Sequence, residues 1–211
     1  KVIYYTEKAL AKTPDLKRFD CEQYLVQDHV AEKLAGTQSN QGVFAVFGQP
    51  VANFLDLPHN GRFLALERVQ DPGNVGALIR SAAAFGFDGV ILSPGCADPF
   101  GPKVLRASMG AAGRMPVVTC PNLADALAQL RAWGSTCLAA ALYNSRPLHE
   151  VDGAYPDGVC VVIGSEGQGL SDGVIAACDA AVRIPITGKV ESLNASVAGS
   201  VLLWHFRGEI Q

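Results

Sequence analysis

One arginine stands alone in a long apolar stretch, DPGNVGALIRSAAAFGFD, at residues 71–88. Arg80 is the only charged side chain between Asp71 and Asp88. A guanidinium in such a place can bind a phosphate, or it can stabilise negative charge that develops on an attacking oxygen. The alternative is an aliphatic stem packed on apolar neighbours, with the charged head reaching solvent. Asn74 is equally open to two interpretations, because asparagine is also a common helix N-cap.

A second candidate segment is GSEGQGLS, residues 164–171, which directly follows the apolar run VCVVI. Its glycines allow the backbone to approach a ligand closely and to hold Glu166 in the bend. Their order is GxxGxG, whereas a dinucleotide-binding turn has GxGxxG and an acidic residue about 20 positions later, where Arg183 stands here. This pattern disfavours a nucleotide-dependent oxidoreductase. The alternative is a glycine-rich turn with Ser171 as a helix N-cap.

The third candidate segment is IPITGKVESLN, residues 184–194. It is longer than a compact domain normally uses to join a strand to a helix, and loops of that length are often functional. Ser192 and Asn194 are both good N-cap residues, so capping of the following helix is the simpler interpretation for one of them. Beyond them, Ala195, Ala198 and Gly199 keep one helix face small and permit close packing of the backbone.

The rest of the chain predicts a scaffold that brings these three segments together. From Arg62 onward, apolar runs alternate with helical patterns, and continuous Val, Ile and Leu runs covered by helices are typical of an α/β fold with a largely parallel sheet. Such a sheet binds its ligand outside the carboxyl ends of its strands, where these loops lie. The predicted strands are 62–69, 89–94, 116–120, 136–142, 158–164 and 181–186, and the predicted helices are 75–86, 102–113, 123–133, 171–178 and 194–206.

The first 48 residues form a smaller predicted domain of mixed strands and helices. The segment QPVANFLDLPHNG, residues 49–61, is the predicted linker because it has two prolines and a polar end. The large domain then covers 62–211. The chain begins at Lys1, inside a predicted strand, so we expect it to be a piece of a longer protein.

Charge and cysteine content limit the function classes. The net charge is −3 over 211 residues, so no basic face is evident from the whole chain, although Lys103, Arg106 and Arg114 share one acid-free stretch. The apolar stretch 195–206 is too short to cross a bilayer, and no signal peptide is recognised, so we expect a cytoplasmic protein. The six cysteines lack the spacing of a metal knuckle or a CxxC motif, which predicts no metal, and several lie in apolar runs such as CVVIG and STCLAAAL, which predicts reduced, buried thiols there.

Three segments in order resemble a known family. LERVQDPGNVGALIRSAAAFGF, VVIGSEGQGLS and IPITGKVESLNASVAGSVLLW look like the three motifs of the SpoU family, and the resemblance covers residues 62–206. Its members are RNA ribose 2′-O-methyltransferases of the SPOUT superfamily, which use S-adenosylmethionine (SAM). The resemblance implies a C-terminal trefoil knot, a feature that folds otherwise nearly exclude. It also implies that residues 1–48 are the trailing part of a small RNA substrate-binding domain.

The resemblance assigns roles to residues of this chain. Asn74, Arg80, Glu166, Ser192 and Asn194 would surround the target ribose. Arg80 would either take the hydroxyl proton or bind a phosphate and stabilise the alkoxide, and a guanidinium pKa above roughly 12 favours the second role. Backbone atoms of the loops would hold SAM, and the implied contacts are Gly164, Gly169, Ile184 and Leu193, together with the strand end Ala140, Ala141 and Leu142.

The implied partners are RNA and a second copy of the chain. RNA phosphates would contact Lys103, Arg106, Arg114 and Lys189, and the extra domain favours rRNA over tRNA. A homodimer would form through the knot region, with the small-residue face of the last helix and Leu203–Trp204 as candidates; ordinary core packing is the alternative. A different function class, a non-catalytic RNA-binding or assembly factor with the same fold, stays open.

Overall fold

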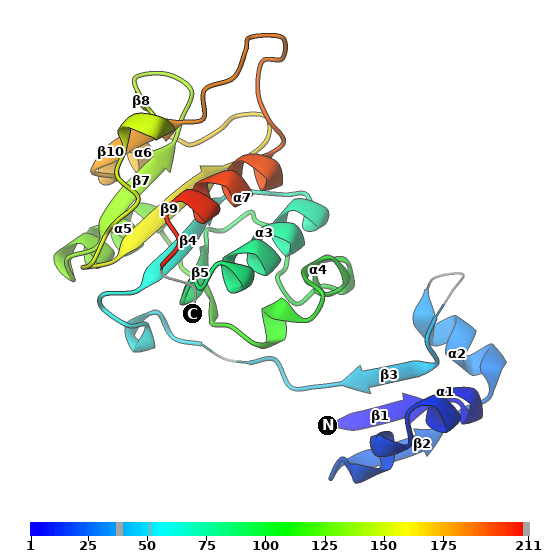
Figure 1. The fold of residues 1–211 in the computed structure, drawn as a ribbon. Coiled ribbons are helices and arrows are strands. Elements are labelled where there is room, and N and C mark those ends of the chain that lie inside the picture. Colours follow the sequence, from blue (N-terminus) through cyan, green and yellow to red (C-terminus); the bar gives the residue numbers. More distant parts are fainter. Residues whose placement is uncertain (37–39, 51, 209–211) are drawn as a thin grey trace. The chain divides into compact units, whose positions relative to one another are not determined.

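The computed structural model describes residues 1–36, 40–50 and 52–208. The chain divides into two compact units, Lys1–Gln49 and Pro50–Gln211 (Figure 1). Parts of the domain and linker ranges expected from the sequence, namely 37–39, 51 and 209–211, lie outside the described residues. Each unit has its own sheet and its own core, so the two are described separately.

The first unit is a three-stranded sheet with helices. Its strand order is β2-β1-β3, with β1 parallel to β2 and antiparallel to β3. Ile3 and Tyr5 alternate with more exposed residues along β1 and form a small core with Ala9 and Leu16. The elements are β1 (Val2–Tyr5), α1 (Glu7–Lys12), β2 (Glu22–Leu25), α2 (Asp28–Ala35) and β3 (Val43–Val46).

The second unit is built on a seven-stranded sheet whose order is β6-β5-β4-β9-β7-β10-β8. Every neighbouring pair of strands in it is parallel. This confirms the α/β fold with a mostly parallel sheet that the sequence predicts. The strands are β4 (Arg62–Glu67), β5 (Gly89–Leu92), β6 (Val117–Thr119), β7 (Thr136–Ala140), β8 (Arg146–Pro147), β9 (Val159–Gly164) and β10 (Ala180–Arg183).

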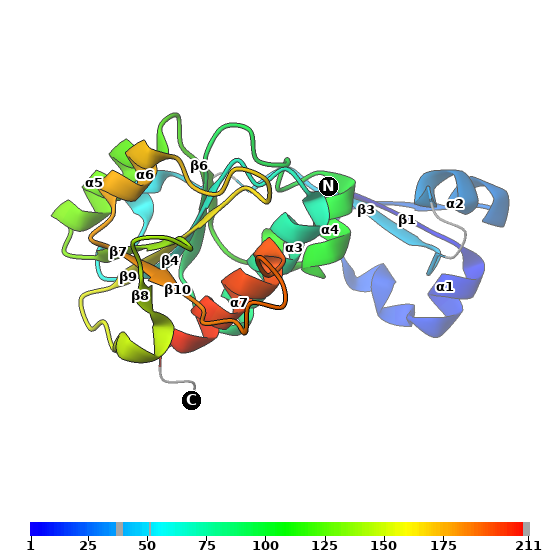
Figure 2. The same cartoon turned by 90° about the horizontal axis from the view of Figure 1, so that it is seen from above.

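Helices cover both faces of this sheet (Figure 2). One layer holds α3 (Pro72–Ala84), α4 (Pro102–Ser108) and α7 (Ala195–His205), and the other holds α5 (Leu123–Ala132) and α6 (Asp172–Ala177). The strands are apolar without interruption because each face needs apolar side chains. In β4, Leu64 and Leu66 join the core under α3, whereas Phe63 and Ala65 join the core under α5.

The connections after the two central strands leave in opposite directions. β4 leads into α3 on one face, whereas its neighbour β9 leads into α6 on the other. Such a reversal opens a crevice at the carboxyl ends of the two strands, which is where open α/β sheets bind ligands. Glu67 and Gly164 are register partners at this point. The loops 67–71 and 164–171 therefore begin side by side.

Several element boundaries differ from the sequence-based expectation. α3 begins at Pro72, three residues earlier than expected, because the Asp71 side chain accepts a hydrogen bond from the Asn74 backbone N–H and caps the helix. The helix expected over 102–113 ends at Ser108, where Met109 adopts the left-handed conformation. The two-residue strand β8 was not expected. The trefoil knot stays a prediction. Among the described residues, no helix is long and apolar enough to cross a membrane.

Candidate active site

Asn74 joins all three candidate segments. It lies in the first turn of α3, where only 9% of the residue is exposed. Its Nδ2 donates to Glu166 Oε1 at 2.7 Å, and its Oδ1 accepts from Asn194 Nδ2 at 3.1 Å. Since Asp71 caps the helix, the interpretation of Asn74 as the N-cap is wrong. The side chain instead connects two distant loops.

The loop 164–171 is a tight turn that two backbone–backbone hydrogen bonds close. The Ser165 and Gly169 backbones donate to each other's carbonyls at 3.2 and 2.9 Å, and Gly169 has a left-handed φ of +67°. A Cβ on Gly164 would lie 2.2 Å from the Gly169 carbonyl carbon. Glycine is therefore required at position 164 for the chain to fold back on itself. The turn presents Glu166 at its tip, hydrogen-bonded to Asn74.

Asn194 caps α7, which confirms one of the two capping alternatives. Its Oδ1 accepts from the backbone N–H groups of Ser196 and Val197 at 2.9 and 3.3 Å. Its amide nitrogen remains available for Asn74. Ser192 is exposed and, in the described parts of the chain, its side chain makes no hydrogen bond. The structure thus unites Asn74, Glu166 and Asn194 and leaves Ser192 outside their network.

Arg80 is exposed on the same helix as Asn74. Six residues separate them, which is about 9 Å along the axis and about 120° around it. Within 1–36, 40–50 and 52–208, the Arg80 side chain forms no hydrogen bond or ion pair. Its positive charge is therefore available to an anionic ligand. The network around Asn74 does not include it.

The expected cofactor contacts follow three neighbouring strands. Gly164 ends β9, Ala140 ends β7 and Ile184 follows β10, and these strands pair in the order β9-β7-β10. The Ala141 backbone N–H donates to the Val182 carbonyl at 3.0 Å, which fixes the end of β7 against β10. The remaining expected contacts differ in accessibility: Leu142 is 50% exposed, Leu193 is half-buried and Gly169 is exposed.

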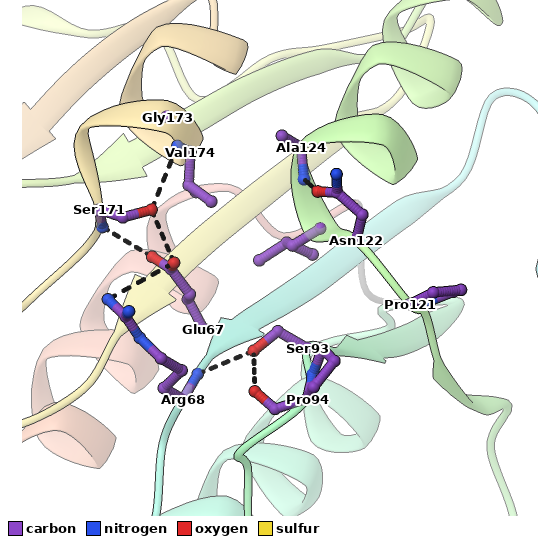
Figure 3. Close-up of a pocket in the computed structure, with 11 residues that line it drawn as sticks. Glu67, Arg68, Ser93, Pro94, Pro121, Asn122, Ala124, Ser171, Gly173 and Val174 are labelled. Atoms are coloured by element: carbon purple, nitrogen blue, oxygen red, sulfur yellow. Dashed lines mark hydrogen bonds and ion pairs between the residues drawn. The ribbon is translucent and has the colours of Figure 1, made fainter.

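A pocket of about 460 Å³ lies beside this region, at the ends of β4, β5 and β6 (Figure 3). Glu67, Arg68, Ser93, Asn122 and Ser171 supply its polar lining. None of the expected cofactor contacts lines it, although Ser171 belongs to the loop 164–171. The pocket and the three strand ends are thus distinct parts of one edge of the sheet.

The four expected RNA-binding cations are all exposed. Lys103 and Arg106 lie on α4, Arg114 follows a short 3-10 helix, and Lys189 lies in the loop before α7. Among the residues that the structure describes, none of the four pairs with a carboxylate. Their charges are free to act on solvent or on phosphates.

The last helix divides into a core face and an exposed face. Gly199 packs so closely on α3 that a Cβ would lie 2.3 Å from Leu78 Cδ2, and Leu203 is fully buried. The expectation that the small-residue face and Leu203 form a subunit interface is therefore wrong, because both pack inside their own chain. Trp204 is 51% exposed and lines an apolar groove with Ser196, Val197, Ser200 and Val201.

All six cysteines are free thiols, and Cys137 and Cys160 are buried on paired strands as the sequence predicts. Burial raises the pKa of Cys178 to about 12 and raises the pKa of Cys160 well above its ordinary value. Thiols with raised pKa values react slowly at neutral pH. No group of three or more His, Cys, Asp or Glu side chains among the described residues is arranged to hold a metal ion.

Comparison with known families identifies the second unit. Residues 61–204 match the SpoU rRNA Methylase family, and this range includes all three candidate segments. The chain belongs to this family. The match covers most of the chain and confirms the resemblance recognised from the motifs. In this SpoU chain, the three family motifs meet in the hydrogen-bonded network of Asn74, Glu166 and Asn194.

Named relatives and a solved structure are similar along nearly the whole chain. An uncharacterized tRNA/rRNA methyltransferase from Synechocystis sp. is 38% identical over 87% of this chain and 66% of its own length. The 23S rRNA (guanosine(2553)-2′-O)-methyltransferase RlmP of Bacillus subtilis is 33% identical over 88% and 72%. The AdoMet-bound rRNA methyltransferase structure from Sinorhizobium meliloti has a TM-score of 0.86 and 28% identity, covering 98% and 78%.

Sequence reasoning missed Glu67, which the structure places between the pocket and the loop 164–171. Only 6% of this residue is exposed, and both of its carboxylate oxygens accept hydrogen bonds from Ser171. The signal was a single acidic residue directly after the apolar run FLAL of β4. Buried carboxylates are rare without specific partners, and the Ser171 backbone N–H and hydroxyl are the partners of Glu67.

Proposed function

We propose that this SpoU chain is a SAM-dependent methyltransferase that transfers a methyl group to a ribose 2′-hydroxyl of RNA. The observation that carries the proposal is the Glu166–Asn74–Asn194 network, which joins the three family motifs into one hydrogen-bonded unit. Arg80 lies six positions beyond Asn74 on α3 and has no hydrogen-bond or ion-pair partner among the described residues. A fixed network can position a reacting oxygen, and an unpaired cation on the same helix can stabilise its charge.

The residues at the ends of β9, β7 and β10 suit SAM as a cofactor. Gly164 allows a tight turn whose backbone groups reach the edge of the sheet, and Ile184, Leu193 and Leu142 offer apolar surface there. Backbone atoms of Gly164, Gly169, Ile184, Leu193 and the segment 140–142 would hold the cofactor. When bound, SAM supplies a methyl group on a positively charged sulfur. Contacts through the backbone need no acidic ribose ligand, which agrees with Arg183 at that position.

The side chains around the ribose divide the remaining work. Arg80 would bind the phosphate next to the target nucleotide and stabilise the alkoxide as the 2′-hydroxyl loses its proton. Its own high pKa makes it a poor proton acceptor. Ser192 and the Asn194 amide would orient the hydroxyl, whereas Glu166 and Asn74 would hold the loops that carry them. Positioning of this kind can remove several kcal/mol of a barrier.

The RNA partner and the oligomer belong to the same proposal. Lys103, Arg106, Arg114 and Lys189 would contact RNA phosphates, and residues 1–48 would serve as part of a substrate-binding domain. Ribosomal RNA is favoured by the names of the relatives. A homodimer through the knot region would use the exposed face of α7, with Trp204 and Val197 at its centre. The protein would work in the cytoplasm without a metal.

Calorimetric titration with S-adenosylhomocysteine tests the proposal first, with NADH as the control ligand. Saturable binding at one site per chain, without an NADH signal, is the expected result. Transfer of a labelled methyl group to ribosomal RNA then separates an enzyme from the alternative, a non-catalytic RNA-binding factor. RNA binding without methyl transfer, by a protein that does not bind S-adenosylhomocysteine, would favour that alternative.

A further inference from the structure

Glu67 is a buried carboxylate at the carboxyl end of β4 (Figure 3). Its Oε2 accepts from the Ser171 backbone N–H at 2.8 Å, and its Oε1 accepts from the Ser171 hydroxyl at 2.7 Å. Arg68 Nη2 lies 3.6 Å from Oε1. Burying a charge is costly unless it is paired and hydrogen-bonded, and here both oxygens have partners. The sheet therefore ends in a fixed, fully satisfied acceptor.

Ser171 connects this acceptor to the candidate cofactor loop. It is the last residue of the loop 164–171 and the N-cap of α6, whose Val174 N–H donates to its hydroxyl oxygen. The Ser171 hydroxyl thus donates to Glu67 and accepts from α6 at the same time. Any movement of Glu67 would be transmitted to the end of the loop.

The loop is hydrogen-bonded at two points to the segment 67–74, and each of these hydrogen bonds is called a tie below. Glu166, near the start of the loop, accepts from Asn74, and Ser171, at its end, donates to Glu67. Both partners lie between residues 67 and 74, at the junction of β4 and α3. The turn closed by Ser165 and Gly169 is held between these two ties. Two ties at separate points restrain both the position and the tilt of a short loop.

We infer that Glu67 is a positioning residue for the cofactor site, acting through Ser171 to hold the loop 164–171 in the shape that binds SAM. The inference rests on the proposed function, since it concerns the same loop. The inference adds that an inner strand of the sheet, β4, fixes the position of the loop. Glu67 ends this strand, two residues after Ala65, which is buried in the core.

The variant Glu67→Gln tests this inference in the full chain. A glutamine has one acceptor oxygen and an NH₂ group, so one of the two Ser171 donors would face another donor. We expect the dissociation constant for S-adenosylhomocysteine to rise roughly tenfold, the change that follows the loss of one charge-assisted hydrogen bond. Amide hydrogen exchange in residues 165–170 should become faster. The kcat for methyl transfer should fall together with affinity.

Asp88→Asn is the matched control, because it also converts a carboxylate to an amide. Asp88 precedes β5 and is hydrogen-bonded to the first residue of β4, at the opposite end of that strand from Glu67. Asp88 Oδ2 accepts from the Arg62 backbone N–H at 2.7 Å. This variant should lower Tm and leave both ligand affinity and loop exchange unchanged. The double variant Glu67→Gln with Ser171→Ala should lose less affinity than the sum of the two single losses, because both changes break the same Glu67–Ser171 hydroxyl bond and the backbone N–H of residue 171 can still donate to the glutamine oxygen.

The outcomes separate this inference from the proposed function. Unaltered affinity and loop exchange in folded Glu67→Gln would overturn the inference and leave the proposed function standing. Additive losses in the double variant would also overturn it, because Glu67 would then act by another route. Failure of the unaltered protein to bind S-adenosylhomocysteine would overturn the proposed function, and this inference with it.

Discussion

The amino ends of the seven strands form one edge of the sheet and their carboxyl ends form the other. Carboxylates accept hydrogen bonds at both edges, but they hold different parts of the chain. At the amino edge, Asp179 accepts from the Cys137 backbone N–H at 2.8 Å and from Arg131 Nε at 2.7 Å, joining the starts of β10 and β7 to α5. At the carboxyl edge, Glu67 and Glu166 accept from Ser171 and Asn74. The amino-edge carboxylate fixes strands, whereas those at the carboxyl edge fix loops.

The edges also differ in what they leave without a partner. The carboxyl edge holds a network through Asn74, with an exposed arginine on the same helix that no described residue pairs. At the amino edge, Arg131 is already paired with Asp179. An arginine with an internal partner contributes to the fold, whereas an exposed arginine with no described partner, such as Arg80, is available to a ligand. The comparison predicts that amino-edge changes affect stability and carboxyl-edge changes affect function.

The largest expected effect follows from Arg80→Ala on α3, the helix that carries Asn74. Methyl transfer should fall by about 10²–10³-fold, since one charge-stabilising donor is removed. Tm and affinity for S-adenosylhomocysteine should stay unchanged, because Arg80 has no partner among the described residues and belongs to no cofactor contact. Single-turnover methyl transfer to ribosomal RNA measures the effect. Retained turnover would contradict the role of Arg80 in methyl transfer. It would also contradict the expectation that changes at the carboxyl edge affect function.

Gly164→Ala should give the next largest effect. The added Cβ would lie 2.2 Å from the Gly169 carbonyl carbon and 2.4 Å from the Leu170 nitrogen, so the loop backbone must move by about 1 Å. Affinity for S-adenosylhomocysteine should fall on the order of 100-fold, as measured by calorimetry. The control is Gly173→Ala in α6, where a Cβ meets nothing within 4 Å. Equal affinities in the two variants would exclude loop 164–171 from the site.

Asp179→Ala tests the amino edge. It removes the acceptor of the Cys137 backbone N–H and the carboxylate that pairs with Arg131. The free energy of unfolding should fall by about 1–3 kcal/mol, measured by urea denaturation. Methyl transfer per folded molecule should be unchanged, because the strand starts lie at the far edge from the loops. Loss of turnover without loss of stability would contradict the division between the two edges.

The sequence predicts the sheet well and the contacts across it poorly. Apolar strands such as RFLALE are recognisable because both faces of each strand are buried, and the loops follow from where those strands end. Asn74, Glu166 and Asn194 were named from family motifs, yet their mutual hydrogen bonds span 92 and 120 residues, which no local pattern encodes. Residues so distant meet only through the strand order.

The last helix shows a second limit of sequence reasoning. Its sequence ASVAGSVLLWH is apolar nearly all round, so periodicity cannot separate a core face from an exposed one. Small residues suggested an interface with another chain, but Gly199 is small because Leu78 of α3 occupies the space. Glu67 shows the opposite case. One acidic residue ending an apolar strand is a local signal, but its partner Ser171 lies 104 residues away.

The smallest expected effect concerns Cys178, at the amino edge next to Asp179. Burial raises its pKa to about 12 from 9.0, so above pH 9 the unfolded chain loses the thiol proton first. The contribution of this thiol to stability is complete below pH 9 and is lost as the pH rises towards 12. Compared with Cys178→Ala, the unaltered protein should therefore lose on the order of 1 kcal/mol more stability between pH 8 and pH 10.

Urea denaturation at both pH values measures the difference, and methyl transfer at pH 8 should be the same in the two proteins. Equal alkaline losses of stability would show that this thiol is accessible to water, and a loss of turnover in Cys178→Ala would connect the amino edge to the chemistry.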